Sequence, residues 1–366
     1  MIDITAYDVI ERRRRLDFGT GVNMAFAPVT FRERGFPDRI DDYAELPQFT
    51  ENMNLLAGPN PWLEAMRVTM LEAAILNNVN AAVLDFNARA CGKRIAPLSS
   101  SATMLPLLRF LTAFADRFHD GRLNVLEIGP GAGYLGLMLA QAGHRYVATD
   151  ATQSFYIWQN ALWEHVMPGA VTETAFDDAP PTTLKTHITH LPWWHFAKLR
   201  DGFDWNIDVV VSKAVLAETH SFFQRFLFRL SELLLRGDRP KAFVFDGVGA
   251  QTHGNRADIH RLLLDYGYHA LNAPELVTKG LDRRLNSRID VYAPRGSLLH
   301  AHGSAEIERE RLPDILQGIT PNTPLSDGDD TVHSIGQVLD IDPDVAYPDY
   351  EFFEFLGTRT AYSGRK

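Results

Sequence analysis

Two kinds of hydrophobic pattern alternate from Leu123 to about Arg295 of this chain. Short apolar runs bounded by glycine, proline or polar residues indicate buried strands. These runs are Val125–Ile128, His144–Thr149, His187–Leu191, Asp208–Val211, Ala242–Phe245, Tyr268–Leu271 and Ile289–Tyr292. Stretches with helical spacing lie between them, at Tyr134–Gln141, Phe155–Pro168, Phe222–Leu235 and Asp258–Tyr266. This alternation predicts an α/β fold with a Rossmann-like, doubly wound sheet of seven strands.

The two flanks of this region have different patterns. Residues 1–120 carry helical spacing at Pro61–Asn77, Asn80–Ala90 and Leu107–Phe118. We therefore predict a helical N-terminal cap at residues 1–120 over the ligand-binding face of a core at residues 121–295. Residues 296–366 contain clusters of proline and aspartate, and their apolar residues are too scattered for a second large core. They are predicted to form a C-terminal extension that either wraps over the core or faces a partner.

A glycine-rich loop between a strand and a helix is the most informative local motif. Gly129, Gly131 and Gly133 follow the strand at 125–128. Glycine lets the backbone turn sharply and lets a ligand approach where a Cβ would clash. The helix that follows points the free N–H groups of its first turn at such a ligand. The next predicted strand leads to Asp150, whose carboxylate is placed to bind a ribose diol.

Two classes of ligand use such a loop. Gly131 begins a G-x-G-x-x-G pattern with Asp150 19 residues beyond it, which is compatible with a dinucleotide. Two features argue against a pyrophosphate, because Glu127 brings a negative charge to the strand end and Pro130 has no N–H to donate. An acidic, proline-containing loop instead suits a cationic ligand without phosphate. S-adenosylmethionine, with its sulfonium, amino-acid head and ribose, is such a ligand.

Charge and composition restrict the partners and the compartment. The net charge of −10 argues against a nucleic-acid partner, which normally requires a basic face. No stretch approaches 18 apolar residues, so neither a membrane span nor a membrane partner is expected. Cys91 is the only cysteine and is expected to be a small buried residue in a reducing compartment. We therefore expect a cytoplasmic protein, and the sequence leaves a homo-oligomer open.

Methyl transfer to a hydroxyl group requires alignment of donor and acceptor and a general base. In doubly wound folds such residues lie at the carboxyl ends of the strands. After the predicted fourth strand, Glu218 and His220 are candidate bases, and His220 has the better matched ordinary pKa. His253, after the fifth strand, is a third candidate, although each of the three is also compatible with an ordinary polar loop residue.

Three histidines close together in the sequence raise the question of a metal site. His187, His190 and His195 could in principle ligate zinc. On a strand, however, His187 and His190 lie an odd number of residues apart and point to opposite faces. We therefore predict no metal. Ser212 and Lys213, which directly follow the predicted fourth strand, are also not the carboxylate ligands that a metal site at this edge of the sheet would use.

The glycine loop resembles the first motif of class I methyltransferases, E-x-G-x-G-x-G followed by an acid that ends the second strand. Matching positions are Glu127, Gly129, Gly131, Gly133 and Asp150. The wider run from 126 to 218 is similar to bacterial sugar O-methyltransferases, in three segments that begin at Leu126, Phe155 and Ser212. The resemblance implies a final pair of strands arranged as a reversed hairpin. It also implies that the cofactor site includes Ala151, Thr152, His190 and Ser212, with His190 in the position of an acid that touches the adenine.

The function expected from this resemblance is S-adenosylmethionine-dependent O-methylation of a small polar metabolite, with a sugar as the favoured acceptor. Trp193 and Trp194 could then offer a stacking platform for the sugar ring or could be part of the core. Two alternatives stay open at this point. One is an N- or carboxyl-methyltransferase of a specialised metabolite or peptide, and the other is a non-catalytic cofactor-binding subunit.

Overall fold

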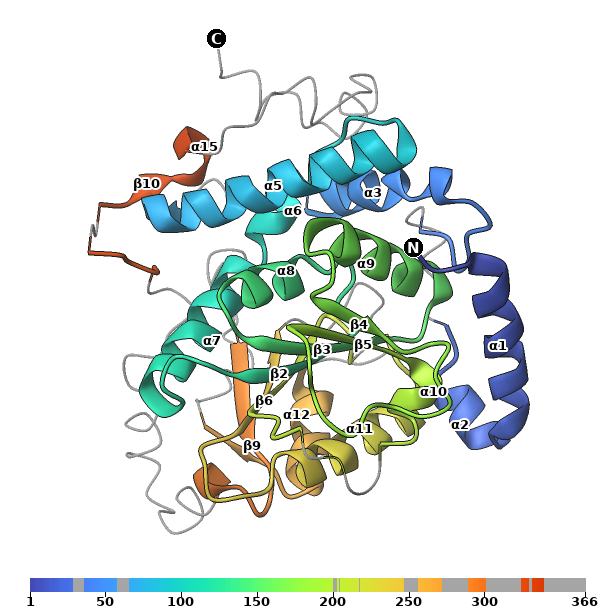
Figure 1. Cartoon of the computed structure of the whole chain (residues 1–366). Helices are drawn as coiled ribbons and strands as arrows, with labels where there is room; N and C mark the ends of the chain where they lie inside the picture. The colour runs from blue at the N-terminus through green and yellow to red at the C-terminus, as the bar shows by residue number, and fades with distance from the viewer. Residues whose placement is uncertain are drawn as a thin grey trace.

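The structure, a computed structural model, is built around one open sheet (Figure 1). It describes residues 1–28, 36–57, 66–199, 203, 205–216, 218–246, 256–271, 289–300, 324–328 and 331–338. Eight strands form this sheet in the order β4-β5-β3-β2-β6-β7-β9-β8. Their bounds are β2 Asn124–Ile128, β3 Arg145–Asp150, β4 Val171–Glu173, β5 Ile188–Pro192, β6 Val209–Lys213, β7 Ala242–Asp246, β8 His269–Ala270 and β9 Ile289–Ala293.

The strand directions confirm the predicted doubly wound α/β fold. Strands β2 to β7 pair with one another in parallel. Strand β9, in contrast, runs antiparallel to both β7 and β8. The last two strands therefore form the expected reversed hairpin. All seven predicted strands are present, and β4 is an eighth that we did not predict. Its three residues, Val-Thr-Glu, contain no apolar run that could have indicated a strand.

Helices cover both faces of the sheet, with α8 and α9 on one side and α11 and α12 on the other (Figure 1). The bounds of the helices of the core are α7 Leu105–Phe118, α8 Tyr134–Gln141, α9 Gln153–Val166, α10 Trp193–Phe196, α11 Ser221–Leu234 and α12 Arg256–Asp265. Helix α8 packs very closely on the sheet, because a Cβ added at Gly136 would lie 2.5 Å from the Tyr146 ring of β3. Gly136 therefore fixes the distance between the glycine loop's helix and the sheet.

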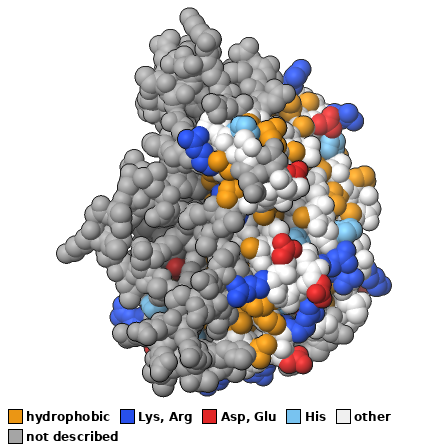
Figure 2. All heavy atoms as spheres, turned by 90° about the vertical axis from the view of Figure 1, so that its left-hand side faces the viewer, with side chains coloured by type: hydrophobic (Ala, Val, Ile, Leu, Met, Phe, Trp, Pro, Cys, Tyr) orange, Lys and Arg blue, Asp and Glu red, His pale blue; other side chains and the backbone are white. Residues whose placement is uncertain are grey.

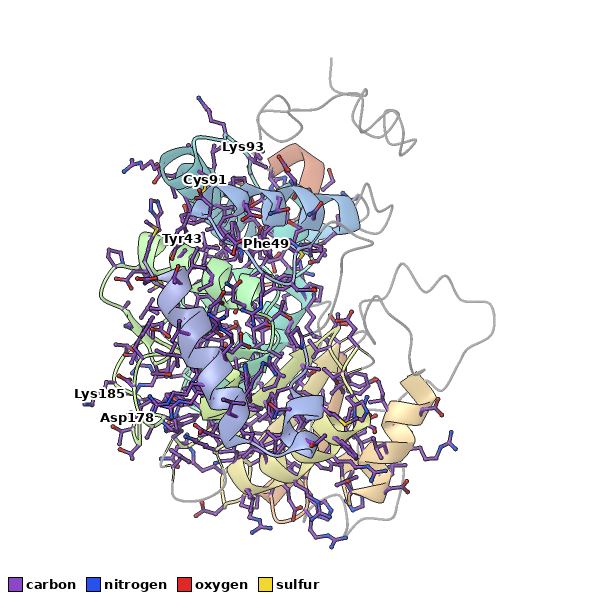
Figure 3. All side chains as sticks on the ribbon, turned by 90° about the vertical axis from the view of Figure 1, so that its right-hand side faces the viewer. Tyr43, Phe49, Cys91, Lys93, Asp178 and Lys185 are labelled. Atoms are coloured by element: carbon purple, nitrogen blue, oxygen red, sulfur yellow. The ribbon has the colours of Figure 1, made fainter. Side chains whose placement is uncertain are left out.

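Residues before the core form mainly helices. Their bounds are α1 Ile4–Asp17, α2 Thr20–Ala25, η2 Tyr43–Glu45, α3 Pro47–Ala57, α5 Met70–Cys91 and α6 Leu98–Ala102. Cys91, at the end of α5, is half-buried rather than buried as we expected. Its thiol donates to the Tyr43 carbonyl across 3.3 Å (Figure 3). Phe49 of α3 stacks on Trp158 of α9, with 5.6 Å between the ring centroids. This contact connects the N-terminal helices to the core beside the glycine loop.

The helical spacing at Pro61–Asn77 and Asn80–Ala90 corresponds to one continuous helix, α5. Residues 61–65 lie outside the described residues, and the helix begins at Met70 after a capping box formed by Thr69 and Glu72. In the structure Asn80 is buried and accepts a hydrogen bond from Ser101, so its polarity serves a contact between helices.

Part of the C-terminal extension contacts these N-terminal helices. Strand β10 (His333–Ser334) pairs antiparallel with β1 (Arg67–Val68), and α15 (Ile335–Val338) follows β10. Leu325 donates its N–H to Glu72 across 2.9 Å and accepts a hydrogen bond from Thr69. These described parts of the extension therefore lie on α5 rather than away from the molecule.

The surface of the described residues carries charges of both signs. Figure 2 shows acidic and basic side chains interspersed with apolar ones on one face. In the described parts of the chain, none of the helices combines the length and the apolar character that a bilayer span requires.

A buried ion pair between α5 and α7 generates a prediction about stability. Arg109 is 5% exposed, and its guanidinium donates to both oxygens of Glu72, which is fully buried, across 2.6 and 2.7 Å. Arg109→Leu leaves that carboxylate without its counter-charge, so we expect a loss of about 3–5 kcal/mol in urea denaturation. Arg89→Leu, at an exposed pair with Asp85, is the matched control and should cost less than about 1 kcal/mol. Equal losses in the two variants would show that burial of the pair does not set the cost of breaking it.

Candidate functional site

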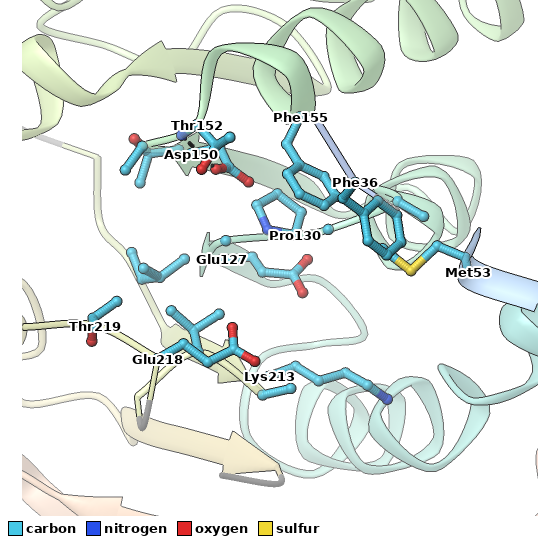
Figure 4. Close-up of a pocket in the computed structure, with 18 of the residues that line it drawn as sticks. Phe36, Met53, Glu127, Pro130, Asp150, Thr152, Phe155, Lys213, Glu218 and Thr219 are labelled. Carbon is cyan, nitrogen blue, oxygen red and sulfur yellow. Dashed lines mark hydrogen bonds between the residues drawn. The ribbon is translucent and has the colours of Figure 1, made fainter. Parts of the chain in front are cut away.

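A cavity of about 380 Å³ lies at the carboxyl ends of β2, β3 and β6 (Figure 4). Strand β2 pairs with β3 on one side and with β6 on the other, so the chain winds in opposite directions from this point. Such a switch point is where doubly wound sheets bind their ligands. The volume lies in the range of roughly 300–1,000 Å³ typical of small-molecule sites.

Asp150 ends β3 and lines the cavity, as the sequence predicted for a residue that binds a diol. Its Oδ1 accepts from the Thr152 N–H across 3.0 Å, and its Oδ2 accepts from Gln159 Nε2 across 3.0 Å. Each carboxylate oxygen can accept a further hydrogen bond. Burial raises the pKa of Asp150 to about 6, against the opposing effect of these hydrogen bonds. Ala151 and Thr152, also predicted, line the same part of the cavity.

Helix α9 holds the glycine loop through three successive carbonyl groups. Gln159 Nε2 donates to the Gly131 carbonyl across 2.9 Å, and Trp158 Nε1 donates to the Ala132 carbonyl across 3.1 Å. Trp163 Nε1 donates to the Gly133 carbonyl across 2.9 Å. The sequence predicted this helix from its spacing alone and gave no sign of these contacts. The Gln159 amide and the two indole N–H groups fix the shape of the loop.

The three glycines of the loop are required for different reasons. All have positive φ, at 62° for Gly129, 58° for Gly131 and 72° for Gly133. A Cβ at Gly129 would meet Val215 at 2.7 Å, and one at Gly133 would meet the Trp163 ring at 2.9 Å. These two positions therefore need glycine for packing. At Gly131, which lines the cavity, a Cβ would meet only the flexible end of Met53, at 3.3 Å, so the space beside it is open to a ligand.

Glu127 of β2 reaches the cavity from a buried position. Tyr146 donates its hydroxyl to Glu127 Oε2 across 2.5 Å. Burial raises the pKa of Glu127 to about 7, and this hydrogen bond and the charge of Lys213 oppose the rise. The ionised form of Glu127 is therefore disfavoured in the protein without a ligand, and a cation in the cavity would stabilise it.

Residues after β6 line the opposite wall. Figure 4 shows Glu218 with its carboxylate directed into the cavity, near Thr219. His220 is exposed and is not one of the lining residues; its Nδ1 accepts the Phe222 N–H across 3.2 Å as the N-cap of α11. The geometry thus brings Glu218, and not His220, together with Glu127 and Asp150. His253 lies outside the described residues.

Two other predicted residues lie behind the cavity rather than in its wall. His190 is fully buried, stacks on Tyr156 with 3.8 Å between ring centroids, and pairs with Gln159 Oε1 across 3.2 Å. It therefore acts on the site through Gln159, which contacts both Asp150 and the loop. Ser212 is also fully buried. Among the residues that the structure describes, no three His, Cys, Asp or Glu side chains come together as a metal site would require.

Of the two interpretations of Trp193 and Trp194, the position in the core is confirmed and the stacking platform is not. Both rings are fully buried, and Trp193 contacts Phe18, Phe26 and Trp194. They form part of the core beneath the N-terminal helices.

Sequence reasoning missed the apolar part of the site. Phe26, Phe36, Met53 and Met104 line the cavity from the N-terminal 104 residues, and Phe36 lies against Phe155 with 5.3 Å between ring centroids. No local signal distinguishes these side chains from other core residues. Lys213 also lines the cavity, and its only signal was its position at the end of a buried strand.

Comparison with known proteins gives only distant likenesses. No family model matches the chain, and no curated protein matches it either. Solved structures that it resembles include magnesium protoporphyrin IX methyltransferase from Synechocystis PCC 6803 with bound SAM, at 17% identity and a TM-score of 0.36. That match covers 60% of this chain and 94% of the other. A TehB-like SAM-dependent methyltransferase from Corynebacterium glutamicum ATCC 13032 is 14% identical over 52% of this chain and 88% of that one, with a TM-score of 0.35. Because these TM-scores are low, we assign the fold from the strand order of the sheet, and we infer the function from the residues that line the cavity.

The raised pKa of Glu127 generates a prediction about stability and pH. A carboxyl whose pKa is higher in the folded than in the unfolded protein stabilises the fold at low pH, and this contribution is lost as the pH rises through the folded pKa. For Glu127 the window runs from its ordinary 4.5 to about 7. Glu127→Gln, which cannot ionise, should therefore gain about 2 kcal/mol over the wild type between pH 5 and pH 8 in urea denaturation.

The matched control is Asp178→Asn, at a fully exposed carboxylate (Figure 3). Its difference from the wild type should not change over this pH range. The contradicting result is a Glu127→Gln protein that is less stable than the wild type by the same amount at pH 5 and at pH 8. That result would show that ionisation of Glu127 does not lower the stability of the fold.

Proposed function

We propose that this chain is an S-adenosylmethionine-dependent methyltransferase that methylates a hydroxyl group of a small polar molecule, with a sugar as the favoured acceptor. The observation that carries the proposal is the charge of the cavity. Glu127, Asp150 and Glu218 all line it, and Lys213 is the one basic side chain among the described lining residues. A cavity with this balance favours a cation that carries a diol.

The glycine loop itself offers few donors to a phosphate. Gly129 gives its N–H to the Thr149 carbonyl, and Gly133 gives its N–H to the Pro130 carbonyl. Pro130 has no N–H. With Glu127 beside this loop, a pyrophosphate would meet a negative charge and few free donors, which supports the sulfonium ligand over a dinucleotide.

The residues present fit S-adenosylmethionine. Asp150 can accept hydrogen bonds from a ribose diol, and the space beside Gly131 leaves room for a ligand against the backbone. Phe36 and Phe155 supply apolar surface near Asp150, which suits the purine ring. When bound, this cofactor supplies an electrophilic methyl group.

The chain's own contribution to the reaction is alignment, exclusion of water and proton removal. Phe26 and Met53 bring apolar surface from the N-terminal helices over the cavity, which limits the access of water. Glu218 is the candidate base, because it points into the cavity and can accept the hydroxyl proton as the oxygen–carbon bond forms. Phe26 and Phe223 line the cavity together with Glu218, and such rings suit the C–H face of a sugar.

The experiment that tests this function is a reaction with methyl-labelled S-adenosylmethionine and a panel of sugars, amines and carboxylic acids. Mass spectrometry of the products should locate the label on a hydroxyl oxygen of a small polar acceptor. Label on nitrogen or on a carboxylate would replace the O-methyl proposal, and binding of cofactor without transfer to any acceptor in the panel would favour a non-catalytic subunit.

Cofactor binding provides the next prediction. Asp150→Ala removes the carboxylate that faces the ribose, so calorimetric titration with S-adenosylhomocysteine should show affinity weaker by about 1.5–3 kcal/mol. Asp178→Ala, at an exposed carboxylate, is the control and should bind like the wild type. Wild-type protein that binds a nicotinamide dinucleotide and ignores the S-adenosyl ligand would contradict the assignment.

Proton removal provides a separate prediction. Glu218→Gln should lower turnover by about two to four orders of magnitude, far more than it weakens cofactor binding. His220→Ala should lower stability by about 1 kcal/mol through loss of the α11 cap and leave turnover near normal. The reverse pattern, with turnover lost in His220→Ala alone, would restore His220 as the base.

A further inference from the structure

Lys213 is a charged side chain in the cavity whose role the proposed reaction does not yet explain. It ends β6, and its side chain is 18% exposed. Removing a lysine from water is costly unless its ammonium is paired and hydrogen-bonded. A lysine at the end of a buried strand, in a cavity, therefore requires either a structural partner or a ligand.

The ammonium is held in place by the protein. Lys213 Nζ donates to the Thr103 carbonyl across 2.5 Å, and Asp246 Oδ2 lies 3.4 Å away. Thr103 accepts one hydrogen bond from the ammonium, and Asp246 lies at ion-pair distance. An ammonium has three N–H donors, so it can also donate to a ligand. The position of the positive charge is thus fixed before any ligand arrives.

Strand register places Lys213 on the same side of the sheet as Glu127. Glu127 is paired with Val211 of β6, and Lys213 follows Val211 by two residues. Since alternate residues of a strand share a face, the two charges project from the same face of neighbouring strands. In Figure 4 Glu127 lies between Asp150 at one end of the cavity and the amino group of Lys213 at the other.

A ligand that meets this order of charges has a diol near Asp150, a positive charge near Glu127 and a negative charge near Lys213. The α-amino-acid head of S-adenosylmethionine carries an ammonium and a carboxylate on one carbon atom. Resting on the function proposed above, we infer that Lys213 binds the α-carboxylate of S-adenosylmethionine and of its product. Lys213 is then a binding residue that selects ligands with the complete amino-acid head.

A purely structural role makes a different prediction. If Lys213 only ties the Thr103 carbonyl to β6 and β7, its loss lowers the affinity for every ligand of the cavity by the same factor. If it binds the carboxylate, its loss affects only ligands that have one. Comparison of S-adenosylhomocysteine with S-adenosyl-3-thiopropylamine, which lacks only the carboxylate, separates the two roles.

The test is calorimetric titration of both ligands into the wild type and Lys213→Met. The wild type should bind S-adenosylhomocysteine about tenfold to a hundredfold more tightly than the decarboxylated ligand, the range for a hydrogen bond between charged groups. In Lys213→Met the two ligands should bind alike, with the decarboxylated ligand little changed from the wild type. Lys185→Met, at an exposed lysine on the surface (Figure 3), should keep the wild-type difference.

Equal weakening of both ligands in Lys213→Met would overturn the inference and leave the proposed function intact. If Lys213→Met does not fold, Lys213→Gln takes its place with the same two opposed outcomes, and equal affinity of the wild type for the two ligands would also overturn the inference. A wild type that binds neither ligand would instead overturn the proposed function itself.

Discussion

The hydrogen bonds from α9 to the glycine loop are the contacts on which the site depends. Three consecutive carbonyls, from Gly131 to Gly133, accept hydrogen bonds from side chains of one helix. One of these side chains, Gln159, also donates to Asp150 and pairs with the buried His190. The loop, the Asp150 carboxylate and strand β5 are therefore joined by a single network. A ligand meets a loop whose conformation is already fixed, which reduces the entropy lost on binding.

The same site carries an electrostatic cost that a cationic ligand would reduce. Burial disfavours the charged forms of Glu127 and Asp150, and the pKa of each is raised accordingly. The fold nevertheless holds both carboxyls at one cavity. Such raised pKa values at a switch point of the sheet are typical of functional sites. A cationic ligand with a diol would stabilise the ionised forms of these carboxyls, and this stabilisation would contribute to its affinity.

Local sequence patterns were sufficient for the sheet, the glycine loop and Asp150, because each is encoded within a short segment of chain. They failed where a residue's role depends on distant segments. Met53 reaches Gly131 from a separate helix, and the tryptophans at 193 and 194 lie in the core because N-terminal residues cover them. His220 matched a base by residue type and strand position, yet it caps a helix, since the direction of a loop side chain cannot be read from spacing.

A crystal structure of the protein with S-adenosylhomocysteine would test the proposed cofactor site most directly. We expect the ligand in the cavity between β2 and β6, with its ribose hydroxyls on Asp150, its thioether and amino-acid head along the glycine loop near Glu127, and its purine ring toward Phe155. A ligand bound elsewhere on the molecule, or bound in this cavity with its ribose away from Asp150, would contradict the assignment.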